Sequence, residues 1–402
     1  MTCILAYIDY WHFLKFPSHI LLVVHGVIIA SLCCSIFSFR KTAYIIWEKI
    51  NNHSLISNNE ISKNLLISIF FLLTLSLGIV IYYNFNFPIK DTTLWHILCS
   101  SSNIDYSVSL EKSLKLINSS CLKYLYTFYQ NTITPIILLS TIHYIGMIKD
   151  RIKIKSILIL FFICIFVVLN SNFNVTKSSL LNYTIVILFF IVWKNNLNII
   201  FYYMYFPFIL LFSIIIVYFF ITQNYSSYKD LENIFSRIFI IPLKMGSWYM
   251  HYTQYYGMIG VKEFPKIASF LSMEGVHSPN IIGKLYGPYY YKRSVLESIH
   301  ANASFLFSFY RAFELFSCLI STLLILALDL ILIILKRLRK GWLVIALSML
   351  SYQSTLFASS SYTTILFSGG VIVSIFLIYF LDQFLPIMYS FLLQTWQKTF
   401  KN

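Results

Sequence analysis

The sequence predicts an all-α polytopic membrane protein. Of its 402 residues, 58% are hydrophobic and only 11% are charged, whereas soluble globular proteins carry roughly 25% charged residues. The mean hydropathy is +0.74. A folded chain with so few polar residues cannot form a polar surface over its whole exterior in water. A membrane protein is therefore the first interpretation. A bilayer core about 30 Å thick needs roughly 20 apolar residues in one helix, and such stretches recur along the chain.

Nine apolar stretches are predicted to span the membrane. Their ranges are 18–38, 64–86, 127–148, 156–170, 179–193, 197–222, 303–335, 342–358 and 362–384. Residues 1–17 are apolar but short and contain Asp9 and His12, so they form either a tenth span or an interfacial helix. They lack the apolar core and small-residue cleavage site of a secretory signal. The predicted fold is therefore a bundle of about nine to ten transmembrane helices.

Basic residues on the short loops set the predicted orientation. They follow the first, third, fifth, seventh and ninth stretches, as Arg40, Lys149, Lys194, Lys336 and Lys398 illustrate. Cytoplasmic loops collect Lys and Arg, so with nine spans all five positions fall in the cytoplasm. The outer side, which is the periplasm in a diderm bacterium, then receives the loops 87–126, 171–178, 223–302 and 359–361.

The longest polar interruption divides the chain into three parts. Transmembrane helices fill 1–222, a large periplasmic loop with short helices occupies 223–302, and further transmembrane helices fill 303–402. The net charge of +15 does not call for nucleic acid as a partner, because the cytoplasmic loops account for most of it. We expect the chemistry to centre on the long loop.

The sequence gives no sign of a metal or a cofactor. It contains no GxGxxG, P-loop, HExxH or GxSxG motif. The acidic residues Asp91, Asp105 and Glu111 of the first outer loop are dispersed. The seven cysteines show no CxxC spacing; Cys99 and Cys121 share an outer loop and either pair there or remain reduced.

The long loop carries eight basic residues against five acidic ones. These cations either form a solvated surface or hold an anionic headgroup, and the planar guanidinium of arginine suits pyrophosphate well. Arg237 is the first candidate, because it lies in the apolar run Ile234–Pro242, where a lone arginine is costly without a partner. Arg293, beside Lys292, is the second candidate.

Aromatic residues and a histidine are the other candidates in the loop. Tyr286, Tyr289, Tyr290 and Tyr291 form either an interfacial aromatic belt or a platform for sugar rings. His300 begins the re-entering helix, where it either caps the helix or exchanges a proton near neutral pH.

The re-entering helix carries an acid and a base three residues apart, Arg311 and Glu314. Residues at this spacing share one face of an α-helix. We therefore predict that they form a structural ion pair.

Several segments resemble, in order, motifs of Wzy-type O-antigen polymerases. They are Asn174–Ser179 (NVTKSS), Ser236–Pro242 (SRIFIIP), Ser278–Gly287 (SPNIIGKLYG), His300–Leu306 (HANASFL) and Ser360–Gly370 (SSYTTILFSGG). The topology resembles that of the family over the whole chain. One departure is that family members often carry glycines after the Ala-Asn-Ala segment, where this chain has none between Tyr310 and Phe316.

The resemblance implies a GT-C-like fold and a metal-independent glycosyltransferase of lipopolysaccharide biosynthesis. Such an enzyme polymerises undecaprenyl-pyrophosphate-linked oligosaccharide repeat units into O-antigen polysaccharide at the periplasmic face of the inner membrane. Its partners would be the lipid-linked oligosaccharide, membrane lipids and a co-polymerase that regulates chain length.

The resemblance also assigns roles to residues. It implies catalysis by His300 and Arg237 and pyrophosphate binding by Arg237, Arg293 and Lys177. It implies sugar contacts by Asn302, Tyr290 and Asn280.

Three other functions remain open. An O-antigen ligase uses the same donor with lipid A–core as acceptor. A flippase for the same lipid-linked unit would have more spans, charges within them and no large outer loop. A membrane O-acyltransferase would need a histidine at membrane depth, for which His25 in the first span is the candidate.

Overall fold

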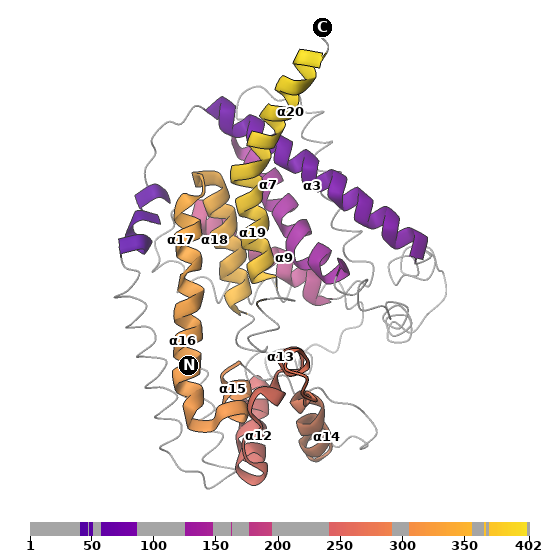
Figure 1. Cartoon of the computed structure of the whole chain (residues 1–402), viewed down its shortest axis with the longest axis vertical. Coiled ribbons are helices and arrows are strands. Elements are labelled where there is room, and N and C mark those ends of the chain that lie inside the picture. The colour runs from indigo at the N-terminus through magenta and orange to yellow at the C-terminus, as the bar shows by residue number, and fades with distance from the viewer. Residues whose placement is uncertain are drawn as a thin grey trace, which may run out of the picture. The chain divides into compact units, whose positions relative to one another are not determined.

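The computed structural model describes a helical protein. The described residues are 41–46, 48–50, 58–86, 125–147, 162, 177–194, 241–291, 305–355, 366 and 370–399. Within these ranges there is no strand, so the predicted helical class is confirmed for them (Figure 1). The chain divides into two compact units. One comprises Met1–Tyr44, Asn224–Ile333 and Ser354–Ile365, and the other comprises Ile45–Gln223, Ile334–Gln353 and Leu366–Asn402.

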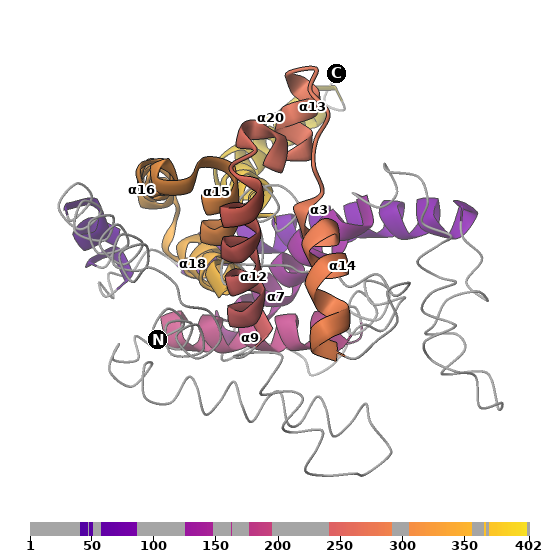
Figure 2. The same ribbon diagram turned by 90° about the horizontal axis from the view of Figure 1, so that it is seen from below.

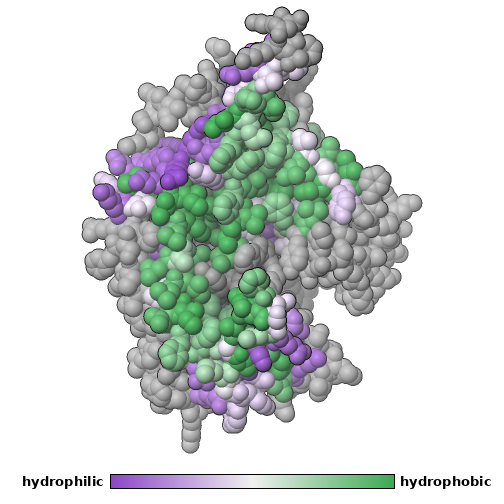
Figure 3. Space-filling view, viewed as in Figure 1, coloured by the Kyte–Doolittle hydropathy of each residue, from purple (hydrophilic) through white to green (hydrophobic). Residues whose placement is uncertain are grey.

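Three helices in the described part of the chain are long and apolar enough to cross a membrane. They are Lys63–Tyr82 with 20 residues, Leu319–Arg337 with 19 and Val371–Gln397 with 27. Apolar side chains cover the visible surface of the second of these helices (Figure 3). The protein is therefore a helical protein that associates with a membrane. The predicted spans 18–38 and 197–222 lie outside the described residues, as does 156–170 apart from residue 162.

The predicted span 303–335 is not one helix. Helix α15 runs over Phe305–Phe313, the 3-10 turn η5 over Glu314–Phe316, α16 over Ser317–Asp329 and α17 over Ile331–Arg337. The break falls where Glu314 takes a left-handed conformation with φ of 48°. A non-glycine residue disfavours this conformation, so an uninterrupted helix is the expectation from sequence alone. The candidate span consequently begins at Leu319, beyond the break.

The unit that contains residues 45–223 is a bundle of apolar helices. Helix α3 (Asn58–Asn86) packs against α7 (Thr134–Met147), and α7 packs against α9 (Lys177–Lys194). The chain continues with α18 (Lys340–Thr355), α19 (Val371–Tyr379) and α20 (Leu385–Thr399). Two π-helical turns, η2 (Tyr129–Ile133) and η8 (Phe380–Phe384), interrupt the long helices. Fully buried side chains such as Leu72, Ile136, Val186, Ile345 and Ile378 form the bundle core.

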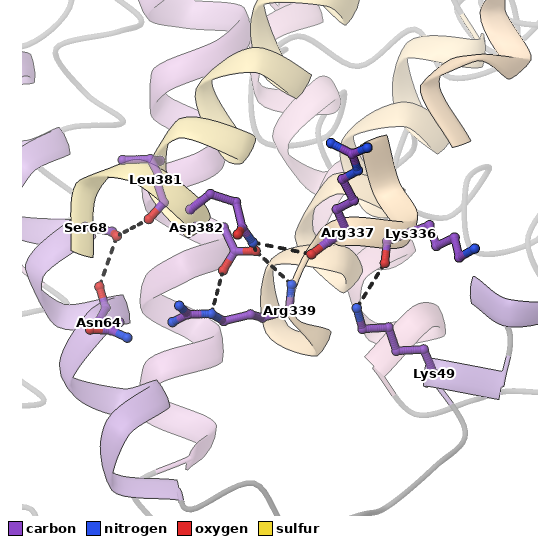
Figure 4. A network of polar contacts seen from close by, with 9 residues as sticks. Lys49, Asn64, Ser68, Lys336, Arg337, Arg339, Leu381 and Asp382 are labelled. Carbon is purple, nitrogen blue, oxygen red and sulfur yellow. Dashed lines mark hydrogen bonds and ion pairs between the residues drawn. The ribbon is translucent and has the colours of Figure 1, made fainter. Parts of the chain in front are cut away.

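A polar network in this unit closes the end of α17 (Figure 4). The buried Asp382, in η8, accepts hydrogen bonds from the backbone N–H of Arg339 at 2.7 Å and from Nε2 of Gln383 at 2.8 Å. Nε of Arg339 lies 3.5 Å from the other carboxylate oxygen. Nε2 of Gln383 also donates to the carbonyl of Arg337, and Nζ of Lys49 donates to that of Lys336. Two carbonyl groups at the C-terminal end of α17, which have no partner within the helix, thus accept hydrogen bonds from side chains.

The Asp382 network yields a stability prediction. Replacing the buried Asp382 by Ala leaves the backbone N–H of Arg339 without its acceptor, so the free energy of unfolding should fall by about 2–4 kcal/mol. Ser390→Ala is the matched control, because this exposed hydroxyl donates only to Ile387 within its own helix, and it should change stability by less than about 0.5 kcal/mol. Denaturant unfolding of the full chain in detergent micelles measures both. Equal stabilities of the two variants would contradict the role of the network.

The other unit contains an assembly of short helices. They are α12 (Ile241–Tyr256), the 3-10 turn η4 (Gly260–Glu263), α13 (Pro265–Phe270) and α14 (Ser278–Tyr291). Helices α12 and α14 run side by side, and α15 packs against α12, η4 and α16 (Figures 1 and 2). The buried Met245, Tyr249 and Ile282 form the core between α12 and α14. Short helices were predicted for this segment; its periplasmic location stays a prediction.

Candidate functional site

The predicted site residues fall in three places. Asn280 is exposed in the first turn of α14, and Tyr290 lies in its last turn. At 1.5 Å per residue these two positions are about 15 Å apart along the helix. Lys177 is the first residue of α9, in the other unit. The remaining predicted site residues lie outside the described ranges and stay predictions: Arg237, Arg293, His300 and Asn302.

A continuous aromatic face runs along α12 and is completed by α14. It consists of Trp248, His251, Tyr252, Tyr255 and Tyr256 from α12 and Tyr286 from α14. The α12 members recur at intervals of three and four residues, which places them on one side of the helix. Tyr286 is among the residues predicted from the sequence, whereas the α12 residues are not. Their recurrence every three or four residues is the sequence signal that indicates this face.

His251 and Tyr286 form the centre of the aromatic face. Nδ1 of His251 lies 2.6 Å from the Tyr286 hydroxyl, a hydrogen bond between the two helices. The His251 ring centroid is 4.7 Å from that of Tyr255 and meets the Tyr286 ring edge-on at 5.6 Å. Trp248 also stacks with Tyr286, at a centroid distance of 5.8 Å. The hydrogen bond and the ring contacts together hold these side chains in one arrangement.

The aromatic face is open to its surroundings at one end. Tyr255 is 74% and Tyr256 is 63% exposed, whereas Trp248, His251 and Tyr286 are half-buried. Partial burial lowers the pKa of His251, so its imidazole is neutral at pH 7. Burial, together with the neighbouring tyrosines, raises the pKa of Tyr286 to about 12, so its hydroxyl keeps its proton. The surface thus combines flat apolar rings with neutral hydrogen-bonding groups, the combination that suits a saccharide ring.

The buried Arg311 of α15 supports the aromatic face from within the protein. Its side chain is 2% exposed, and its Nη1 donates a hydrogen bond to the carbonyl of Gly257. The guanidinium carbon lies 4.7 Å from the centroid of the Tyr252 ring, a cation–π contact. The N–H of Ile259 in turn donates to the carbonyl of Arg311 at 3.3 Å. Arg311 therefore fastens the C-terminal end of α12 to α15.

Gly257 makes this contact possible. It follows the last residue of α12 with φ of 67°, in the left-handed region where glycine is favoured. Its N–H donates to the carbonyl of Thr253 at 2.8 Å, which ends the helix, and its own carbonyl accepts from Arg311. The C-terminus of a helix carries partial negative charge, so a cation is well placed there.

The predicted ion pair between Arg311 and Glu314 is wrong. Both residues are described, and no ion pair joins them. Helix α15 ends at Phe313, and the left-handed conformation of Glu314 turns the chain away from the helical register. The three-residue spacing brings side chains together only if the helix continues.

Glu263 is a buried acidic residue close to Arg311 and Tyr249. It is 6% exposed, and the Ser278 hydroxyl at the start of α14 donates to its Oε2. Burial raises the pKa of Glu263 to about 8, although the Ser278 hydrogen bond and the charge of Arg311 act in the opposite direction. The carboxyl group is therefore mostly protonated at pH 7. Nε of Arg311 and the hydroxyl of the buried Tyr249 have no hydrogen-bond partner among the described residues.

The described residues give no metal site. No three His, Cys, Asp or Glu side chains within these ranges gather closely enough to hold a metal ion. The prediction that the chemistry needs no metal is not tested by this observation.

No family model, curated protein or solved structure matches the chain. The resemblance to O-antigen polymerases therefore rests on the sequence segments alone and stays a prediction.

The pKa of Glu263 yields a prediction about stability. A carboxyl whose pKa rises from 4.5 to about 8 on folding holds a proton that the unfolded chain releases. Its contribution to stability is full below pH 4.5 and is lost as the pH rises through about 8. Glu263→Gln should flatten this slope in pH-dependent thermal unfolding of the full chain. The exposed Glu274→Gln is the control and should keep the wild-type slope; identical profiles for both variants would contradict the buried, protonated Glu263.

Proposed function

We propose that the protein is a membrane-bound glycosyltransferase that polymerises undecaprenyl-pyrophosphate-linked oligosaccharide repeat units into O-antigen polysaccharide. The observation that carries the proposal is the aromatic face of α12 and α14. It offers stacked rings and a neutral His251–Tyr286 pair, which suit the C–H faces and hydroxyls of sugars. The membrane-associated fold and the sequence segments that resemble O-antigen polymerases support the same function.

In the proposed reaction a sugar hydroxyl of the acceptor unit attacks the anomeric carbon of the donor chain. The bond from that carbon to the lipid pyrophosphate breaks, and the pyrophosphate leaves with the electron pair. Fixed cations stabilise the charge that develops on this leaving group, a role that we assign to Arg237, Arg293 and Lys177. A general base takes the proton of the attacking hydroxyl, and we assign that role to His300.

We assign the aromatic face to saccharide binding. Trp248 and Tyr286 supply parallel ring faces, and Tyr255 and Tyr256 extend the surface at its exposed end. Asn280, Tyr290 and Asn302 are further sugar contacts in the proposal. The substrate would thus meet the chain on its periplasmic side, at the inner membrane, and the reaction would need neither metal nor cofactor.

Genetic deletion tests the proposed activity. Lipopolysaccharide from a strain without this gene should carry single repeat units, because ligation continues after polymerisation stops. A deletion that leaves no repeat unit on lipid A–core would instead indicate the ligase, and full-length chains would contradict both enzymes. Complementation with wild type should restore the ladder of bands, whereas Arg237→Ala and His300→Ala should not. A full ladder from both variants would contradict their assignment.

The role of the aromatic face has its own test. Tyr286→Phe keeps the ring beside Trp248 but removes the hydroxyl that pairs with His251, and His251→Ala removes both the pair and a ring. Each should lower the rate of chain extension by about two- to tenfold, the value of such contacts, in a membrane assay that follows repeat-unit addition. Lys284→Ala, at an exposed position of α14, is the control. Equal rates in all three variants would contradict saccharide binding at this face.

A further inference from the structure

Helix α13 and the turn after it expose an apolar tip. We define the tip by Ile267, Phe270, Leu271 and Met273, which are 41%, 88%, 49% and 47% exposed. Ile267, Phe270 and Leu271 are three and four residues apart, so they lie on one side of the helix. Phe270 is more exposed than any other large hydrophobic side chain in the described part of the chain.

Two apolar residues at the start and in the middle of α13 are firmly packed instead. Phe264 and Ala268 are 5% and 0% exposed. The Phe264 ring contacts Phe309 and Phe313 of α15 at centroid distances of 5.2 and 6.3 Å. The outward face is therefore presented by a helix that is anchored through its inward face. A cluster of exposed large apolar side chains is typical of a membrane or protein contact, not of a surface in water.

The turn that carries the tip is closed by backbone contacts. The N–H of Met273 donates to the carbonyl of Ala268 at 2.8 Å, and the N–H of Ser272 donates to that of Ser269 at 3.0 Å. This is a Schellman motif with Ser272 in the left-handed position, φ 57°. Backbone groups that are bonded internally can leave water at little cost, which is the condition for entering lipid.

The returning segment fixes the base of the tip. The N–H of Val276 donates to the carbonyl of Lys262 at 2.7 Å. A Cβ atom at Gly275 would lie only 2.5 Å from Cα of Pro265. The outgoing and returning segments therefore approach so closely that only glycine fits at this position. The tip is therefore a preformed projection, which would not have to order itself on binding.

The nearest apolar phase available to this tip is the membrane that holds the chain. Helix α15, against which α13 and η4 are anchored, leads through Phe316, which is 72% exposed, into the candidate span Leu319–Arg337. In Figure 1, α13 lies at the end of α12 and α14 toward which α16 runs. The first part of that candidate span, up to Ile333, belongs to the same unit as the tip.

A protein partner fits the tip less well than lipid does. A stable protein–protein interface buries about 800 Å² on each partner, and four side chains, three of them about half exposed, offer much less. The exposed cation Lys262, whose carbonyl is bonded at the base of the tip, suits the anionic headgroups of a lipid surface.

We propose that the apolar tip inserts into the lipid surface of the membrane that the chain spans. Insertion would place Phe270 and Leu271 below the headgroups and hold η4, with Glu263, at the membrane surface. The proposal does not depend on the enzymatic activity. It assigns α13 a lipid-binding role, and the chemical class of its ligand is the phospholipid bilayer.

Site-specific quenching tests insertion. The full chain is prepared in phospholipid nanodiscs with one fluorescent amino acid in place of Phe270. Matched samples carry the probe at Lys284, exposed on α14, and at Leu323, 57% exposed in the candidate span. Quenching by brominated phospholipid is compared with quenching by aqueous iodide at each position.

Insertion predicts that lipid quenching at position 270 approaches the value at 323 and exceeds that at 284 several-fold, while iodide quenching is weak. Iodide quenching at 270 equal to that at 284 would overturn the proposal, because the tip would then be in water. Protection at 270 from both quenchers would also overturn it, because a second protein surface, such as another copy of the chain, would then cover the tip.

Discussion

The described assembly of short helices depends on the contacts of one buried group, the guanidinium of Arg311. It joins the carbonyl of Gly257, the ring of Tyr252 and the helix that leads into the candidate span Leu319–Arg337. Removal of the Arg311 side chain would leave the carbonyl of Gly257, just after α12, without a donor. It would also open a cavity beneath the aromatic face. Breaking one side of a buried charged contact commonly costs about 3–5 kcal/mol. Because Glu263 is mostly protonated, the cation is held chiefly by a helix end and a ring, not by an ion pair.

This anchor connects membrane entry to the candidate binding surface. Arg311 contacts Tyr252, which belongs to the aromatic face, while its helix packs against η4 and Phe264, which support the apolar tip. The two surfaces thus share one support, with Glu263 and Ser278 buried between α12, η4 and α14. An enzyme whose substrate has a lipid part and a sugar part needs both surfaces at a fixed separation. In the proposed function, the inserted tip would fix the distance of the aromatic face from the lipid surface, and the aromatic face would bind the sugar at that distance.

The sequence predicts the helical class and several apolar helices well, because hydropathy over about 20 residues is a strong local signal. It does not predict the break at Glu314, since a left-handed non-glycine residue depends on tertiary contacts such as those of Arg311. The pairing of His251 with Tyr286 depends on the packing of α12 against α14, which no local pattern encodes. The exposed apolar face of α13 cannot be predicted from its short apolar run, because the same run would also fit a buried helix. Of the predicted site residues, Asn280 and Tyr290 lie on the same helix but at opposite ends. The two residues predicted to be catalytic, His300 and Arg237, lie outside the described residues.

The most direct test of the account is reconstitution of the purified full chain in lipid nanodiscs with lipid-linked repeat units isolated from a strain that lacks this gene. The measurement is the release of free polyprenyl pyrophosphate, quantified together with the length of the saccharide that remains on the lipid. The account predicts one pyrophosphate released for each repeat unit added, with the rate unchanged by a metal chelator. Release without lengthening, or lengthening only when a divalent metal is supplied, would contradict it.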